Sequence, residues 1–205
     1  RDVERSRGLG DVYKRQFVAR LKDGWYTVDG KKYEMKIHGL ARYNTFKAVE
    51  NTGNSLTMRF ESDEETKKQY PFDFRFDVKY TLEGSSLKIA YEVENTGDKE
   101  MFFGLGTHFG WIIDGEEGDG FCDVSGNYAL IDTDAPIMQY EFDDDTHLVK
   151  GIKAAEFTNR IPLDKSTFRH DAVVMENSAE KVTLIRRNGK KIVFDIGKVP
   201  VLAIW

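Results

Sequence analysis

Cysteine is almost absent from this sequence, and that absence limits what the protein can be. The 205 residues contain one cysteine, Cys122. A single cysteine excludes an internal disulfide and a zinc site built on cysteine pairs. It also suits a reducing compartment. We therefore expect a cytoplasmic protein without a structural metal.

Long apolar runs are also absent. No stretch approaches the roughly 18 apolar residues of a membrane-spanning helix, so we expect no membrane partner. The net charge is −5, whereas nucleic-acid surfaces carry basic clusters, so we expect no nucleic-acid partner. The acidic stretch EFDDDTH (residues 141–147) lacks the glycine and spaced oxygens of an EF-hand loop. We interpret it as an exposed acidic loop rather than a calcium site.

The dominant pattern that is present is an alternation of apolar and charged residues with a period of two. It runs through FDFRFDVKYTL (72–82) and LKIAYEVEN (87–95), and KVTLIRRNGKKIVFDI (181–196) forms two such runs around Asn188-Gly189. Alternation predicts strands with one buried face and one exposed face, and Asn-Gly supplies the positive φ of a tight hairpin. About fourteen candidate strands follow from these criteria. We predict one all-β domain, a sandwich or a barrel, over residues 17–205.

The hairpin over residues 72–95 is expected to form the spine of the sheet, with strands near ten residues long. A broad, twisted sheet offers a concave face on which a ligand can lie. Only two short helical turns are expected. One covers residues 63–69, with Asp63 or Ser62 as its N-cap, and the other covers residues 153–157.

Both ends of the sequence differ from the rest. Residues 1–16 carry five Lys/Arg and three Asp/Glu, and GLGDVYKRQ (8–16) resembles a translated sequencing adapter. We interpret residues 1–16 as a non-native or disordered tail, with a genuine polar tail as the alternative. The other end stops at Trp205 within the apolar stretch VPVLAIW. Natural domains seldom stop in this way, so we expect a fragment cut at both ends.

Four stretches contain side chains that could carry chemistry. They are FVARLKDG with Arg20, IHGLAR with His38 and Arg42, FFGLGTHFGW with His108, and FRHDAVVM with Asp171. Glycines beside both histidines would let the backbone turn, and those around His108 would direct it from a strand end into a cleft. Taken singly, each residue has a structural explanation: a lone histidine is more often structural, Asp171 could cap a turn, and Arg42 could be a solvated charge.

The order of these stretches carries a resemblance to a known family. ARLKDGWYTVDGKKYEMKIHGLAR, then YPFDFRFDVKYTLEGSSLKIAYEVENTGDKEMFFGLGTHFGW, then FRHDAVVM and VPVLAIW resemble the aldose 1-epimerase (galactose mutarotase) family. The resemblance is strongest to a divergent bacterial branch; it covers residues 17–205 and weakens between 114 and 167. It implies a large antiparallel, galactose mutarotase-like β-sandwich with a concave sugar-binding face. It also implies interconversion of the α and β anomers of free aldoses without a cofactor.

The resemblance further implies catalytic roles for the two histidines. His108 matches the histidine that protonates the ring oxygen of the sugar. His38 matches the histidine that holds the sugar and assists at the same oxygen. The ring then opens, the C1–C2 bond rotates, and the ring closes on the other face of the aldehyde. A histidine is a suitable proton donor to an ether oxygen near neutral pH.

Substrate-binding residues are implied in the same way. Arg20 matches an arginine that binds a sugar hydroxyl, although the family's preceding asparagine is Ala19 here. Asp171 falls near the family's substrate-binding aspartate, with His170 as a competitor for that role. Arg42 belongs to the branch motif. Trp111 could stack on a pyranose face or could equally be a core tryptophan.

Two departures from the family pattern bear on catalysis. The family has proline after its second histidine, where this chain has Phe109. The family's general base is the glutamate of a Glu-Pro-Trp motif, and the 205 residues contain no Glu-Pro pair. We therefore expect the base to be missing from this fragment. The alternatives are a non-catalytic carbohydrate-binding sandwich and a hexose-6-phosphate 1-epimerase. No oligomeric state follows from the sequence.

Overall fold

The computed structural model describes residues 14–16, 20–111, 113, 124–169 and 172–205. Its secondary structure is nearly all β, as the alternation predicts. Every strand pair it contains is antiparallel, as the family resemblance implies. The chain divides into two compact units, residues 1–110 and residues 111–205. That residues 17–205 act as one domain stays a prediction. No helix in the described part of the chain is long and apolar enough to cross a membrane.

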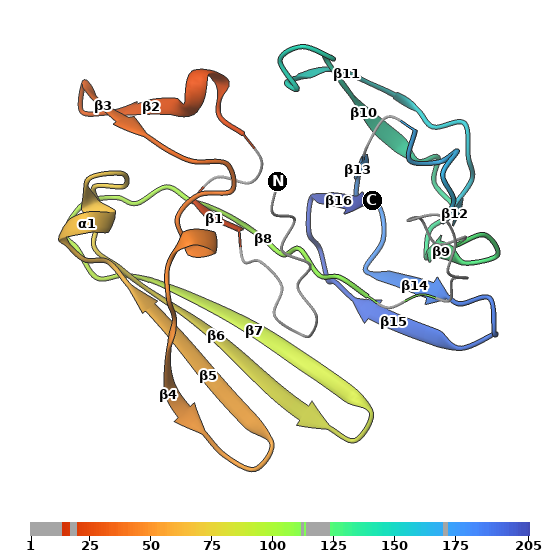
Figure 1. The fold of residues 1–205 in the computed structure, drawn as a ribbon, viewed down its shortest axis with the longest axis horizontal. Coiled ribbons are helices and arrows are strands. Elements are labelled where there is room, and N and C mark those ends of the chain that lie inside the picture. The colour runs from red at the N-terminus through yellow and green to blue at the C-terminus, as the bar shows by residue number, and fades with distance from the viewer. Residues whose placement is uncertain (1–13, 17–19, 112, 114–123, 170–171) are drawn as a thin grey trace, which may run out of the picture. The chain divides into compact units, whose positions relative to one another are not determined.

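The first unit is built on a four-stranded meander, drawn from orange to yellow-green in Figure 1. Its strands are β4 (Lys47–Asn51), β5 (Ser55–Glu61), β6 (Phe74–Glu83) and β7 (Ser86–Asn95), in that order across the sheet. A second hairpin pairs β2 (Trp25–Val28) with β3 (Lys31–Glu34), and β1 (Lys14–Gln16) pairs with β8 (Gly104–Gly106). Three residues that the sequence analysis assigned to the N-terminal tail thus form a strand.

The predicted central hairpin is confirmed, since β6 and β7 each have ten residues. Gly84 in the connecting turn has a φ of 60°, which a glycine adopts without steric cost. One face of the sheet is apolar: Phe60, Phe74 and Phe76 are at most 5% exposed. This face forms most of the first core, together with Met35, Leu40 and Tyr70 of the same cluster.

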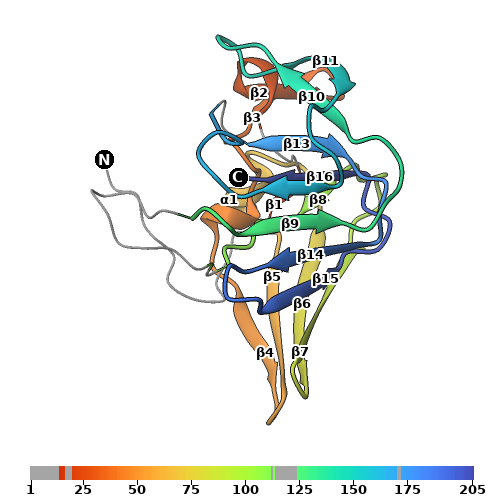
Figure 2. The ribbon, with the colours of Figure 1, turned by 90° about the vertical axis from the view of Figure 1, so that its right-hand side faces the viewer.

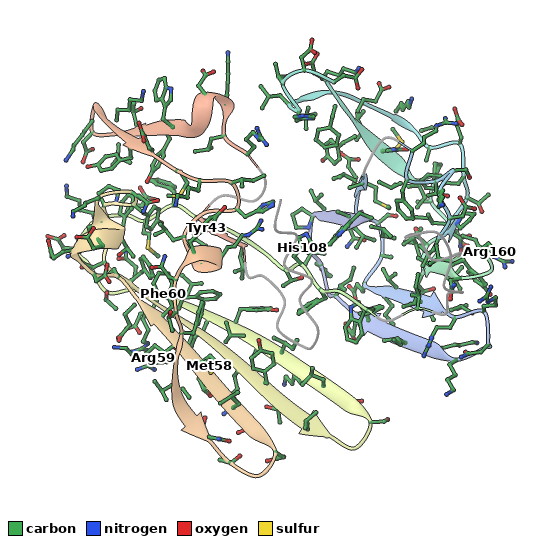
Figure 3. The ribbon with its side chains drawn as sticks, in the orientation of Figure 1. Tyr43, Met58, Arg59, Phe60, His108 and Arg160 are labelled. Atoms are coloured by element: carbon green, nitrogen blue, oxygen red, sulfur yellow. The ribbon has the colours of Figure 1, made fainter. Side chains whose placement is uncertain are left out.

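The opposite face of the meander carries ion pairs between neighbouring strands. Arg59 lies directly across from Asp77 in the β5–β6 register. Its Nε and Nη2 donate to the two carboxylate oxygens of Asp77 at 2.8 and 2.7 Å. Figure 3 labels Arg59 and its neighbour Phe60, which belong to these two faces. Alternation of the sequence therefore separates the core from the charged face, as its period of two predicts.

One of the two predicted helical turns lies in this unit, between β5 and β6. Helix α1 (Glu64–Lys67) begins at the N-cap Asp63, whose Oδ1 accepts from the backbone N–H of Thr66 at 2.8 Å. This confirms the turn predicted over residues 63–69. The hydrogen bond from Thr66 holds the pKa of Asp63 below its usual value, because it favours the charged carboxylate. The helical turn predicted over residues 153–157 is wrong: Lys153 pairs with Gln139 in β11, which continues to Ala154, and residues 155–157 are not helical.

The second unit contains two four-stranded sheets, seen in Figure 2. One has the order β11 (Val149–Ala154), β10 (Met138–Phe142), β13 (Val173–Glu176), β16 (Val201–Ile204). The other has the order β12 (Arg160–Pro162), β9 (Tyr128–Ile131), β14 (Lys181–Ile185), β15 (Lys191–Asp195). The predicted turn at Gly189, with a φ of 82°, joins β14 to β15. Buried residues of both sheets, among them Ile131, Ile161 and Met175, form the second core.

Asn127 ties two loops of the second unit together and gives a first testable prediction. It is 2% exposed. Its Nδ2 donates to the Val124 carbonyl at 2.7 Å and its Oδ1 accepts from the Arg187 N–H at 3.1 Å. Asn127→Ala leaves both groups without this partner, so the free energy of unfolding should fall by about 2–3 kcal/mol.

Asn177 provides the matched control. It also donates to a carbonyl, that of Val199, and accepts from an N–H, that of Ala179. It is partly exposed, so water can replace these bonds and Asn177→Ala should cost less. Urea denaturation of both variants compares the two values. Equal losses would show that burial of Asn127 does not decide its contribution.

Candidate functional site

The candidate site of the first unit is organised by the segment that follows β3. The N–H of Gly39 donates to the Lys36 carbonyl at 3.0 Å, which closes a turn over residues 36–39. His38 and Gly39 both have positive φ, 66° and 71°. Glycine adopts this conformation freely, and histidine does so more readily than most other residues. The backbone therefore turns at the His-Gly pair, as the glycine in the sequence predicts.

A buried anchor holds this turn in place. Leu40 and Ala41 are 1% and 4% exposed and belong to the first core. The 3₁₀ turn η2 (Ala41–Tyr43) follows, and Asn44 Nδ2 donates back to the Leu40 carbonyl at 2.9 Å. Two core residues directly after Gly39 thus fix the backbone position of His38, whose side chain is half-buried.

His108 lies close to His38, although it belongs to the last segment of the first unit. It comes two residues after β8, and the backbone before β8 is held by Tyr70, whose Oη donates to the Phe102 carbonyl at 2.7 Å. Tyr70 is itself 1% exposed in the first core. Figure 3 labels His108. Gly104 and Gly106 lie in strand β8 and are not among the positive-φ glycines of the described residues. Of these glycines, only Gly39, beside His38, adopts the left-handed backbone conformation with positive φ.

The two histidines are neighbours, although seventy positions separate them in the sequence. Their ring centroids are 6.3 Å apart, and the ring planes are inclined by 67°. Two hydrogen bonds of about 2.6–3.2 Å, one from each imidazole, can meet at a single atom between rings at this separation. The arrangement can therefore present two proton donors or acceptors to one oxygen of a ligand.

Two arginines predicted for the site belong to the same unit. Arg20 is exposed and lies just before the 3₁₀ turn η1 (Lys22–Gly24). Its convergence with the two histidines stays a prediction. Arg42 is exposed on η2, four residues after His38, with its guanidinium carbon 5.7 Å from the centroid of the Tyr43 ring. Sequence reasoning overlooked Tyr43 and Lys36, whose ammonium group lies 5.0 Å from that same centroid.

The remaining predicted site residues belong to residues 111–205. Trp111 is 38% exposed, and its ring packs against Phe194 of β15, with centroids 4.9 Å apart and planes inclined by 70°. The interpretation as a packed tryptophan thus has a structural basis, and stacking on a sugar stays a prediction. Asp171 and its competitor His170 lie outside the described residues, as does Cys122.

The acidic stretch 141–147, predicted as a loop, begins in β10, which continues to Phe142. The loop starts at Asp143, whose carboxylate binds groups of the loop itself. Asp143 Oδ1 accepts from the N–H of Asp145 and from the N–H and hydroxyl of Thr146, at 3.2, 2.8 and 2.8 Å. These bonds, the backbone bond from Thr146 above all, lower the pKa of Asp143. No group of three His, Cys, Asp or Glu side chains within the described residues is arranged to hold a metal ion.

A family model and curated proteins match most of this chain. The family model described as aldose 1-epimerase matches residues 12–205. Among curated proteins, the plasmid-encoded LacX of Lactococcus lactis subsp. lactis is 27% identical over 171 residues, which is 82% of this chain and 57% of LacX. The chain thus spans little more than half the length of this relative.

Solved structures resemble the chain over nearly all of its length. A galactose mutarotase related enzyme from Lactobacillus acidophilus has a TM-score of 0.83 and 28% identity, covering 94% of this chain and 65% of that one. A galactose mutarotase-like protein from Lactobacillus casei has a TM-score of 0.78 and 24% identity, covering 94% and 66%. The chain spans less than two thirds of each of these proteins.

Proposed function

Because the chain belongs to the aldose 1-epimerase family, whose model matches residues 12–205, we propose that its protein interconverts the α and β anomers of a free aldohexose. The observation that carries the proposal is the pair of imidazoles, His38 and His108, with centroids 6.3 Å apart. Anomer interconversion requires proton transfer at the ring oxygen, and two histidines that can meet at one atom supply such a site.

In the proposed mechanism, His108 donates a proton to the ring oxygen while a base removes the proton from the C1 hydroxyl. The bond between C1 and the ring oxygen breaks and an aldehyde forms at C1. The C1–C2 bond rotates, and the reverse transfers close the ring on the other face. His38 holds the ring oxygen beside His108. No net change of atoms or electrons occurs, so the reaction consumes no co-reactant.

The base is the part of the mechanism for which the 205 residues offer no match. The family resemblance assigns it to the glutamate of a Glu-Pro-Trp motif, and each of the four prolines here follows a residue other than glutamate. We propose that a carboxylate outside this sequence supplies the base. On this proposal, the 205 residues alone supply the acid for the ring oxygen and lack the base for the C1 hydroxyl.

Further side chains are proposed to bind the sugar hydroxyls. Arg20, Arg42 and Asp171 can make charge-assisted hydrogen bonds with a polyol, and Trp111 can contribute a ring face. The proposed substrate is a small sugar bound without a cofactor. The single cysteine supports a location in the cytoplasm.

Polarimetry of freshly dissolved α-glucose tests the proposed reaction. We expect the 205-residue chain to leave the rate near that of the spontaneous reaction, because general base catalysis is worth roughly 10²–10⁴ in rate. The protein encoded by the complete gene should accelerate the change in rotation. If the 205-residue chain matches the complete protein, the base lies within these residues. If neither accelerates the reaction but both bind the sugar, the carbohydrate-binding alternative holds.

Sugar binding is expected to be weak. A single pyranose offers little apolar area, and its hydroxyls exchange hydrogen bonds with water for hydrogen bonds with protein at small net gain. We expect dissociation constants for glucose and galactose of about 1 mM or higher. Isothermal titration measures them. Micromolar binding of a neutral hexose would contradict this expectation.

A further inference from the structure

The strand that leads to His108 depends on a partner for its order. This strand, β8, reads Gly-Leu-Gly. Glycine loses more backbone freedom on folding than any other residue and has no side chain to pack, so a strand with two glycines is weak by itself. Tyr70 binds the carbonyl of Phe102, which lies six positions before His108 and outside β8. Among the described strands, β8 pairs with β1 alone.

Strand β1 faces both glycines of β8. Gln16 lies across from Gly104, at one end of the antiparallel register. Lys14 lies across from Gly106, at the other end, two positions before His108. Figure 1 labels β1 beside β8. Pairing binds backbone N–H and C=O groups of β8 and fixes its extended conformation. The position of β1 therefore sets the direction in which the chain reaches His108.

The same strand lies beside the segment that follows His38. Cα atoms of β1 lie within 8 Å of Cα atoms of η2. This 3₁₀ turn starts three positions after His38, at Ala41, which is buried in the first core. β1 thus neighbours both the strand that leads to His108 and the turn that leaves His38. It bridges two segments seventy positions apart, whose imidazole centroids are 6.3 Å apart.

We infer that β1 is a positioning strand of the candidate site: its backbone holds the segment of His108 against the turn of His38. β1 lies within the region that the family model matches, which begins at residue 12. Two imidazoles that must meet at one oxygen tolerate little displacement. The effect of β1 on the ring positions stands without the proposed function, whereas its effect on sugar binding rests on that function.

Proline substitutions in β1 test the inference. The double variant Arg15→Pro, Gln16→Pro removes two successive backbone N–H groups. Successive N–H groups of a strand point to opposite edges, so one of the two faces β8, and proline cannot replace it in the ladder. The double variant Arg15→Ala, Gln16→Ala is the matched control. It changes the same positions but keeps both N–H groups, so it should keep the pairing.

Proton NMR of the 205-residue chain measures whether the rings stay together. A nuclear Overhauser cross-peak between ring protons of His38 and His108, assigned with His38→Asn and His108→Asn, reports that the imidazoles are neighbours. We expect the cross-peak in the unmodified chain and in the alanine variant, and its loss in the proline variant. Amide hydrogen exchange of β6 and β7 should be the same in all three, because β1 pairs with neither strand.

Titration with glucose in the same spectra adds a readout that depends on the proposed function. Glucose bound at the pair should shift the ring resonances of His38 and His108 in the unmodified chain. The proline variant should need on the order of tenfold more glucose for the same shift, because its site is no longer preorganised. The alanine variant should match the unmodified chain.

The outcomes separate this inference from the proposed function. A cross-peak that persists in the proline variant would overturn the inference, as would its loss in the alanine variant. Faster exchange of β6 and β7 in the proline variant would also overturn it, since β1 would then support the whole unit instead of the site. Absence of the cross-peak from the unmodified chain would contradict both the inference and the geometry behind the proposed function. If glucose shifts neither ring in the unmodified chain, the proposed function fails, while the cross-peak still decides the role of β1. A cross-peak lost in the proline variant alone, with exchange unchanged, supports the inference.

Discussion

Replacing His108 by asparagine should slow anomer interconversion by a factor of about 10²–10⁴ in the protein encoded by the complete gene, the usual contribution of a general acid. Asparagine is similar in size and can donate a hydrogen bond to the ring oxygen, but it cannot transfer a proton. A large loss would therefore separate proton transfer from mere contact. Polarimetry with freshly dissolved α-glucose measures the rate.

The pH dependence of the rate adds a readout that a structural role would not change. If a protonated imidazole is the acid, the rate falls as pH rises through the range in which histidine loses its proton. This alkaline decline should disappear in His108→Asn. A variant that keeps the decline would assign the acid to another group, and His38 would be the next candidate.

Two further histidine variants serve as comparisons. His38→Asn preserves the local backbone, because asparagine tolerates the positive φ of 66° found at this position. It should weaken sugar binding and lower the rate less than His108→Asn does, if His38 mainly holds the ring oxygen. His147 also has positive φ, 56°, in the turn between β10 and β11, so His147→Asn is the matched control. Its rate should equal that of the unmodified protein.

Most of the fold follows from local patterns in the sequence. Period-two alternation predicted β6 and β7, and Asn-Gly predicted the turn between β14 and β15, because both signals act over a few residues. The helical turn expected over residues 153–157 failed for a related reason. Pairing of β11 with β10 is a contact between segments, and it overrides the weak helical preference of a short stretch.

The candidate site could be predicted only in part. His38 and His108 were selected through the family resemblance, and their proximity depends on the core that carries Leu40 and Tyr70. The distance between two side chains seventy positions apart cannot be derived from the sequence alone. The contacts of Lys36 and Arg42 with the Tyr43 ring were not predicted, because lysine is a common surface residue type and Arg42 was selected only through the family motif. Only the turn at Gly39 and the bond from Tyr43 to Ile37 bring them to one ring.

The packing of β6 leads to the second large expected effect, on stability. Phe76 is 0% exposed at the centre of the first core. Its ring lies 5.7 Å from that of Phe46 and 6.4 Å from that of Tyr91, between centroids. Phe76→Ala removes these contacts and leaves a cavity that a paired sheet cannot easily close. We expect the free energy of unfolding to fall by about 3–5 kcal/mol.

Phe102→Ala is the matched control, because Phe102 is 69% exposed in the same unit. Its hydrogen bond with Tyr70 uses the backbone carbonyl, which alanine retains, so the change should stay within about 0.5 kcal/mol. Urea denaturation gives both values, and amide hydrogen exchange of β6 and β7 assigns the loss to the first unit. Since small domains are typically stable by about 5–15 kcal/mol, Phe76→Ala should expose these amides to much faster exchange. Similar losses for the two phenylalanines would mean that the β6 face does not form the core of this unit.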